Sequence, residues 1–192
     1  METERFVLRN ARHLAADYMI RSIREGDSVV DATMGNGKDT LFLCELVGEK
    51  GHVYAFDVQA EAVERTKERV QEAGFGERTT LFLAGHETMA QHVKAPVQAV
   101  MFNLGWLPGA EHIVTTKTDT TLEAVRAACD LIASGGIVTV CVYPGHEEGT
   151  RELSALLEYA AALDVRRFNV AHHRFINASS QTPQLILIQK NK

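Results

Sequence analysis

The sequence lacks a long hydrophobic run and has few cysteines. No apolar stretch approaches the roughly 20 residues that span a bilayer, and the first five residues are too polar for a secretory signal. We therefore expect a cytoplasmic protein without a membrane partner. Cys44, Cys129 and Cys141 are far apart, have apolar neighbours and lack the Cys-x-x-Cys spacing of zinc or redox sites. They are expected to be buried, reduced thiols.

An excess of positive charge is also absent, because 20 Lys and Arg residues stand against 25 Asp and Glu residues. The net charge of −5 supplies no general attraction for nucleic acid, although it leaves room for a local basic patch. Hydrophobic residues make up 45% of the chain and charged residues 23%, which excludes a disordered or fibrous protein. With no repeat or Pro/Gly/Ser-rich linker, residues 1–192 are expected to form one domain.

Apolar periodicity alternates regularly between strand-like and helix-like segments. Strands are predicted over 28–33, 52–57, 79–84, 97–103, 137–143, 164–171 and 184–189. Helices are predicted over 38–48, 59–74, 86–92, 119–133 and 148–162. This alternation predicts an α/β protein with a mostly parallel sheet and helices on both faces. No helix separates the last two strands, so they are expected to pair antiparallel.

A further helix is predicted at about 7–24, with one apolar face and one basic face. The apolar face would carry Leu8, Ala11, Ala15, Tyr18 and Ser22. The basic face would carry Arg5, Arg9 and Arg12, and a second basic group comprises Arg166, Arg167 and Arg174. Such groups are candidates for phosphate contacts, although each arginine is equally compatible with a solvated surface.

The first predicted strand leads into a glycine turn that is typical of a nucleoside-cofactor site. Gly35, Asn36 and Gly37 supply the tight turn and aim the N-terminus of the next helix at a ligand. Asp57 closes the second strand 20 residues after Gly37, where a carboxylate can accept both hydroxyls of a ribose. An NAD-binding turn usually has Gly or Ala where this chain has Thr40, so S-adenosylmethionine (SAM) fits better.

Asp31, just before the glycine turn, has two interpretations. It can sit near the methionine part of SAM, or it can cap the local backbone. His86 follows the third strand, where it can lie near an adenine or can cap the short helix after it.

The fourth strand ends in Asn103, followed by a turn that contains Trp106 and Pro108. An amide followed by an aromatic and a proline resembles the Asn-Pro-Pro-Tyr element of methyltransferases that act on amino nitrogens. The amide oxygen can hold the nucleophile and the aromatic ring can stack on a base. Alternatively, Asn103 makes an Asx turn and Trp106 fills the core.

Histidines supply one further catalytic candidate and no metal site. His146 follows the fifth strand and can move a proton near neutral pH, or it can have a purely structural role. His172 and His173 are adjacent in a predicted strand and face opposite sides, so they do not bind one metal together. We expect no metal cofactor.

Together these segments resemble the YtqB/MnmM family of rRNA methylases. The resemblance implies a Rossmann-like, class I SAM-dependent methyltransferase with seven strands, similar to enzymes that methylate 5-aminomethyl-2-thiouridine at the tRNA wobble position. Carried over by motif, five residues would bind the cofactor, and Asn103 would face the amine. The five are Asn36, Asp39, Asp57, Gln59 and His86. The family often has Tyr where this chain has Trp106.

The expected function is thus a tRNA wobble-uridine methyltransferase that uses SAM and binds the anticodon arm, and a homodimer is compatible with the sequence. Three alternatives stay open: a methyltransferase acting on rRNA or a small amine, a non-catalytic RNA-binding protein, and a nicotinamide-dependent oxidoreductase. The cofactor candidates from the glycine turn itself are Asp31, Gly35, Gly37 and Thr40. The catalytic candidates are Asn103, Trp106 and His146.

Overall fold

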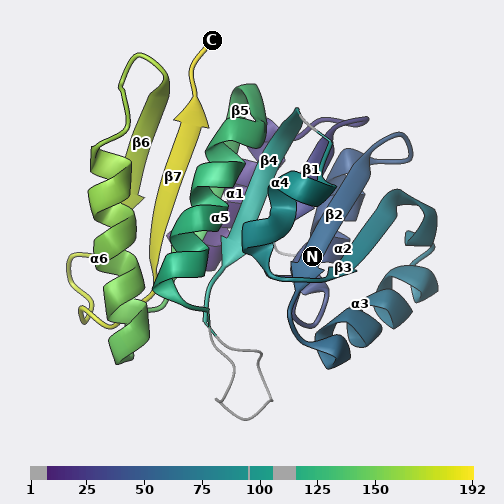
Figure 1. Ribbon diagram of the computed structural model, residues 1–192, viewed down its shortest axis with the longest axis horizontal. Helices are drawn as coiled ribbons and strands as arrows, with labels where there is room; N and C mark the ends of the chain where they lie inside the picture. The colour runs from purple at the N-terminus through teal and green to yellow at the C-terminus, as the bar shows by residue number, and fades with distance from the viewer. Residues whose placement is uncertain (1–7, 95, 106–115) are drawn as a thin grey trace.

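Seven strands form one sheet in the computed structural model, which describes residues 8–94, 96–105 and 116–192 (Figure 1). Their order across the sheet is β3-β2-β1-β4-β5-β7-β6. The strands are β1 Ser28–Asp31, β2 His52–Asp57, β3 Thr79–Leu83, β4 Val97–Asn103, β5 Ile132–Val142, β6 Phe168–His173 and β7 Gln184–Lys190. The order reverses direction between β1 and β4, so the crevice for a ligand is expected there, at the carboxyl ends of these two strands.

The strand directions confirm the predicted sheet. β1 pairs parallel with β2 and β4, while β2 pairs parallel with β3 and β4 with β5. β7 runs antiparallel to both β5 and β6, as the missing helix between the last two strands predicted. The carboxyl ends of β1, β2, β3, β4 and β5 therefore meet at one edge of the sheet.

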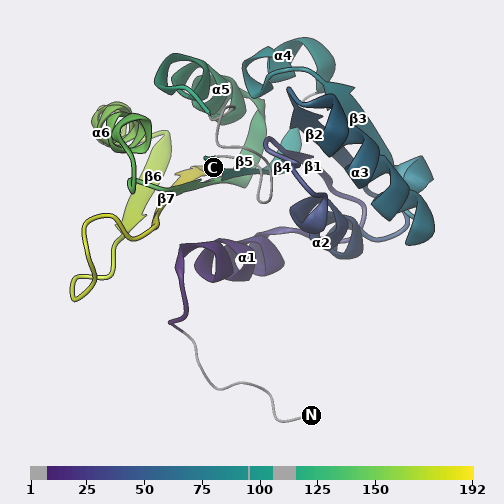
Figure 2. The ribbon, with the colours of Figure 1, turned by 90° about the horizontal axis from the view of Figure 1, so that it is seen from below.

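Helices cover both faces of the sheet (Figure 2). The helices of eight or more residues are α1 Ala11–Ser22, α2 Lys38–Val47, α3 Ala60–Glu72, α5 Thr118–Leu131 and α6 Glu147–Ala161, and the shorter ones are α4 Met89–His92, η1 Gly76–Arg78 and η2 His86–Thr88. α1 and α2 lie on one face, and α4, α5 and α6 lie on the other. α3 packs beside α2 against β2 and β3.

Alternate residues of the central strands fill two separate cores. Val30 of β1 packs in the cluster beneath α5 and α6, whereas its neighbour Val29 packs in the cluster beneath α1 and α2. Strand side chains alternate between faces, so Val29 and Val30 make both faces of β1 apolar, and its polar residues, Ser28 and Asp31, stand only at its two ends. Cys44, Cys129 and Cys141 are buried free thiols in these cores, as predicted.

Several predicted element bounds are wrong. The opening helix begins at Ala11 and not at 7, because the side chain of Asn10 caps it by accepting the backbone N–H of His13 at 3.0 Å. Leu8 therefore lies outside the helix with 72% of its surface exposed, and the buried residues of the helix are Ala11, Leu14, Ala15 and Met19. The basic helical face is wrong for Arg9, which precedes the helix, whereas Arg5 lies outside the described residues.

Two strands also begin at residues other than those predicted. β6 begins at Phe168 rather than 164, because Asp164 forms a turn in which its carboxylate accepts the backbone N–H of Arg166 at 2.9 Å. β5 begins five residues earlier than predicted, at Ile132, and is irregular at Gly135, whose φ of 79° suits glycine.

Within the described residues, no helix is long and apolar enough to cross a membrane.

Candidate active site

The main cavity opens at the carboxyl ends of β1, β2, β3, β4 and β5 and has a volume of about 570 Å³. Its walls come from α1, the glycine turn, the ends of five strands and the start of α5. The polar residues that border it are Arg12, Thr33, Asn36, Lys38, Asp39, Asp57, Gln59, His86, Glu87, Asn103, Thr116, Lys117, Thr120 and Tyr143. Most of the predicted site residues are thus brought together from distant parts of the chain.

The glycine turn has the backbone geometry that its sequence predicted. Gly37 precedes α2 with a φ of 75°, and a Cβ at this position would lie 3.1 Å from the backbone Cα of Thr66 in α3. Gly35 also has a positive φ, of 49°, and its carbonyl accepts the Thr66 hydroxyl at 3.1 Å. The turn therefore lies against α3, and α2 begins at Lys38, directly on the cavity.

Asp57 sits at the end of β2, where its carboxylate borders the cavity. One oxygen accepts the backbone N–H of Gly35 at 3.0 Å and the other that of Gln59 at 2.9 Å. Burial raises the pKa of Asp57 above its ordinary value, and these backbone donors oppose the rise. Each oxygen retains a lone pair, so the carboxylate can still accept two hydroxyl groups from a ligand.

Asp31 and Thr40 lie beneath the glycine turn and do not border the cavity. Asp31 is 1% exposed, and its carboxylate accepts the Thr40 hydroxyl at 2.7 Å and the backbone N–H of Thr33 at 3.1 Å. This is the local backbone cap that the sequence left open as an alternative for Asp31. Burial, together with the nearby Asp39, raises the pKa of Asp31 to about 7.

Asn36 borders the cavity from the glycine turn, and His86 borders it from the segment that follows β3. The Asn36 side-chain oxygen accepts an N–H of Arg65 in α3 at 3.0 Å. The His86 Nδ1 donates to the Ala32 carbonyl at 3.3 Å, and burial lowers the pKa of this imidazole. A neutral ring with Nδ1 protonated leaves Nε2 as an acceptor, which suits an adenine amino group.

Asn103 belongs to a hydrogen-bonded chain of four side chains. An Arg12 N–H donates to one Asp39 carboxylate oxygen at 2.6 Å, and the Asn103 amide donates to the other at 3.3 Å. The Asn103 oxygen in turn accepts the Tyr143 hydroxyl at 2.7 Å. The backbone N–H of Asn103 donates to Thr33 at 2.8 Å, which fixes the end of β4 beside the end of β1.

The other two catalytic candidates have different outcomes. His146 does not border the cavity; it caps α6, where its Nδ1 accepts the backbone N–H of Gly149 at 3.1 Å. This placement corresponds to the structural role that the sequence left open for His146. Trp106 lies outside the described residues.

Sequence reasoning did not find two of the four residues in the hydrogen-bonded chain around Asn103, namely Arg12 and Tyr143. Arg12 was assigned to a basic surface, but it pairs with Asp39 across 27 positions of the chain. Tyr143 lies 40 positions from Asn103. The available signal was its place at the end of β5, next to β4, where a side chain is directed toward the same edge of the sheet.

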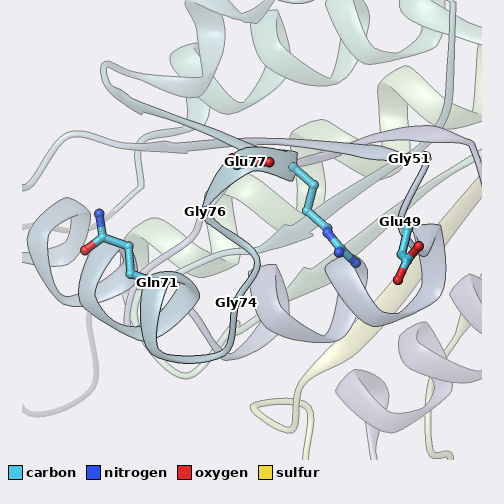
Figure 3. Close-up of a pocket in the computed structure, with 7 residues that line it drawn as sticks. Glu49, Gly51, Gln71, Gly74, Gly76 and Glu77 are labelled. Carbon is cyan, nitrogen blue, oxygen red and sulfur yellow. The ribbon is translucent and has the colours of Figure 1, made fainter.

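A second hollow, of about 510 Å³, lies at the opposite edge of the sheet (Figure 3). It borders the segments that precede β2 and β3, and Figure 3 shows Glu49 and Gln71 on its two sides. Its volume is close to that of the main cavity, so volume alone does not select the site. The amino ends of parallel strands are not where α/β proteins bind ligands, and the network around Asn103 lies at the main cavity instead.

Comparison with known proteins decides the family. A family model described as "Putative rRNA methylase" matches residues 53–189. The chain belongs to this rRNA methylase family. A Clostridium thermocellum protein with the same description is 40% identical to this chain, with a TM-score of 0.94 over 96% of this chain and 100% of its own. The predicted family resemblance and the predicted methyltransferase fold are therefore confirmed.

Two other relatives have more specific descriptions. A Streptococcus mutans protein crystallised in complex with SAH is 33% identical, with a TM-score of 0.86 over 96% of this chain and 99% of that chain. The chloroplastic tRNA (mnm5s2U34)-methyltransferase of Arabidopsis thaliana is 38% identical over 165 residues, which are 81% of this chain. This chain spans about 60% of the length of the plant protein.

Proposed function

We propose that the chain is a SAM-dependent N-methyltransferase that converts 5-aminomethyl-(2-thio)uridine into 5-methylaminomethyl-(2-thio)uridine at the tRNA wobble position. The observation that carries this proposal is one cavity lined by a carboxylate, Asp57, which is suited to the hydroxyls of a ribose, and by an amide, Asn103. The similarity to the Arabidopsis tRNA (mnm5s2U34)-methyltransferase supports the choice of substrate. A methyl donor and an amine can then meet between the two groups.

The residues of the cavity fit SAM. Asp57 can accept the ribose hydroxyls, Asn36 and Gln59 lie beside it, and His86 suits the adenine. The N-terminus of α2 has no side-chain cap in its Gly37 turn, so its backbone N–H groups suit the carboxylate of the methionine part. The Streptococcus mutans relative, crystallised with SAH, supports this assignment. Among the described residues, no group of His, Cys, Asp and Glu side chains is arranged to hold a metal ion.

SAM, when bound, supplies a methyl group on a sulfonium, and methyl transfer from it depends on alignment and on exclusion of water. The amine must attack in its neutral form, because the nitrogen needs its lone pair. Asn103 is proposed to hold the amine by accepting one of its N–H groups, which directs that lone pair toward the methyl carbon. Since the Asn103 side chain is fixed at both ends, this acceptor is in place before the substrate binds.

The experiment offers purified protein and methyl-labelled SAM to three pools: tRNA carrying the aminomethyl nucleoside, rRNA and small amines. We expect label in tRNA only, with a gain of one methyl group on the wobble nucleoside by mass spectrometry. Label in rRNA would favour the activity that the family description names. SAM binding without any methyl transfer would favour the non-catalytic RNA-binding alternative.

The finer parts of this proposal have tests of their own. Binding to an isolated anticodon stem-loop tests whether that arm is sufficient for recognition. Light scattering on the purified protein distinguishes a homodimer from a monomer.

A further inference from the structure

We propose that the Tyr143 hydroxyl oxygen accepts an N–H of the substrate amine, and that Asn103 holds this hydroxyl in place. The inference rests on the proposed function, because it requires an amine as the nucleophile. Tyr143 and Asn103 border the same cavity from the ends of neighbouring strands, β5 and β4. The amine would thus have two oxygen acceptors, one from each residue.

The orientation of the Asn103 amide follows from its partners. Asp39 offers only acceptor oxygens, so the Asn103 side chain must turn its NH₂ group toward Asp39, at 3.3 Å. The Asn103 oxygen then faces Tyr143, at 2.7 Å. A flipped amide would set its oxygen against the Asp39 carboxylate, and Arg12 holds that carboxylate from the other side at 2.6 Å.

The Tyr143 hydroxyl has one proton, and the Asn103 oxygen accepts it. The lone pairs of the Tyr143 oxygen are therefore left to accept a hydrogen bond from the cavity. Burial raises the pKa of Tyr143 to about 12, so the phenol keeps its proton at neutral pH. Tyr143 is thus suited to orient an amine and is not suited to deprotonate it.

An acceptor at this place stabilises the transition state more than the bound substrate. As the N–C bond forms, the C–S bond breaks and its electron pair stays on sulfur. Positive charge moves from sulfur to nitrogen, so the N–H groups become stronger donors during the reaction. The surplus proton leaves the methylated ammonium for water afterwards. Removal of the acceptor should therefore lower kcat more than it raises KM.

The test is Tyr143→Phe, which keeps the ring and removes the acceptor. We expect the single-turnover rate at saturating SAM and tRNA to fall about 10- to 100-fold, as for one lost charge-assisted hydrogen bond. SAM affinity and the KM for tRNA should stay within about twofold of the wild-type values. A loss of SAM affinity in step with the rate would show that Tyr143 supports the cofactor site, and would overturn the inference.

A double-mutant cycle tests the dependence on Asn103. If Asn103 holds the hydroxyl, Tyr143→Phe should slow the Asn103→Ala variant much less than it slows the wild type. Equal effects in both backgrounds would contradict the inference.

The matched control is Tyr159→Phe on α6, which removes a tyrosine hydroxyl that lies against Cys129, away from the cavity. Its methylation rate should equal that of the wild type. If the wild type itself fails to methylate the amine, the proposed function fails and the inference falls with it. If the wild type is active and Tyr143→Phe is equally fast, the inference alone is wrong.

Discussion

At the residue scale, three aspartates near the glycine turn differ in what surrounds their carboxylates. Asp31 is buried among Thr33 and Thr40, Asp39 lies between Arg12 and Asn103, and Asp57 faces the cavity with two backbone donors behind it. The same residue type thus supports the turn, fixes an amide or is available to a ligand, according to its neighbours. Two of these assignments lead to direct tests.

Asp57→Ala should weaken SAM binding by about 100-fold or more. A ribose would lose two charge-assisted hydrogen bonds, each worth about 1.5–3 kcal/mol before compensation. Isothermal titration calorimetry measures the change, and Asp164→Ala, in the remote turn before β6, is the control. An unchanged dissociation constant in a folded Asp57→Ala variant would mean that Asp57 does not touch the cofactor.

Asp31→Asn should change how stability depends on pH. Burial raises the pKa of Asp31 from 3.8 to about 7, so the folded chain keeps a proton that the unfolded chain has already lost. The free energy of unfolding therefore falls as pH rises through this range, by up to about 1.4 kcal/mol per pH unit from this group. The asparagine side chain of the variant cannot ionise, but it can still form hydrogen bonds with Thr33 and Thr40.

The check is urea unfolding of both proteins, without SAM, at about pH 5 and about pH 8. From pH 5 to pH 8, the free energy of unfolding of Asp31→Asn should rise by about 1–3 kcal/mol relative to that of the wild type. Other titrating groups are common to both proteins and cancel in this difference. Parallel pH dependences would show that Asp31 ionises normally in the folded chain.

Single residues of the site were predictable from sequence where the signal is local. Asp57 and Asn103 end strands, and the glycine turn has its own spacing, so their place at the cavity follows from the strand pattern. The Arg12–Asp39 and Asn103–Tyr143 contacts join elements far apart in the chain, and no periodicity encodes them. Asp31 illustrates the limit, because only the folded chain distinguishes its two interpretations.

At the element scale, the turn before α2 depends on backbone conformation and on close packing against α3. Gly37 and Gly74 have nearly the same φ, 75° and 76°, but only Gly37 has a neighbour, Thr66, within reach of an added Cβ. Alanine variants at these two positions therefore separate the free-energy cost of a left-handed backbone, which both share, from the cost of steric contact, which only Gly37→Ala has.

Gly37→Ala should lower the free energy of unfolding by about 2–4 kcal/mol, and Gly74→Ala by about 1 kcal/mol. Only Gly37→Ala should also weaken SAM binding, because the contact with Thr66 displaces the start of α2. Urea unfolding and calorimetry measure the two effects. Equal destabilisation of the two variants would refute the role assigned to the Thr66 contact.

The elements themselves were largely predictable, and their ends were not. The alternation of strands and helices indicated the parallel sheet, and the missing last helix indicated the antiparallel β7. The α1 and β6 predictions were too long because a side chain ends the element: Asn10 caps α1 and Asp164 closes the turn before β6. Apolar periodicity continues through such caps, so it overestimates the length of the element. The β5 prediction was instead too short, since the strand continues through the irregularity at Gly135.

At the scale of the whole molecule, the proposed function requires an acidic chain to hold an anionic RNA over one edge of its sheet. Of the predicted basic face, Arg9 precedes α1, and Arg12 pairs with Asp39 and helps to build the cavity. Two exposed cations lie at the edge of the sheet where the cavity opens: Lys117, which borders the cavity at the start of α5, and Arg174, which directly follows β6. Lys50 and Lys94 are also exposed, but they precede β2 and β4 at the opposite edge.

Reversing Lys117 and Arg174 to Glu should therefore raise the KM for tRNA, while reversing Lys50 and Lys94 should not. Both double variants change the net charge by the same amount, so a general repulsion of RNA would affect them equally. If Lys117 and Arg174 contact phosphates, the first double variant also releases fewer counterions when it binds tRNA. The slope of log affinity against log salt concentration should then fall in magnitude by about one unit per lost contact. Filter binding of tRNA across a salt series measures both effects, with SAM affinity as the check on folding. If the two double variants bind tRNA alike, the RNA docks on another face and the cavity edge is not its binding surface.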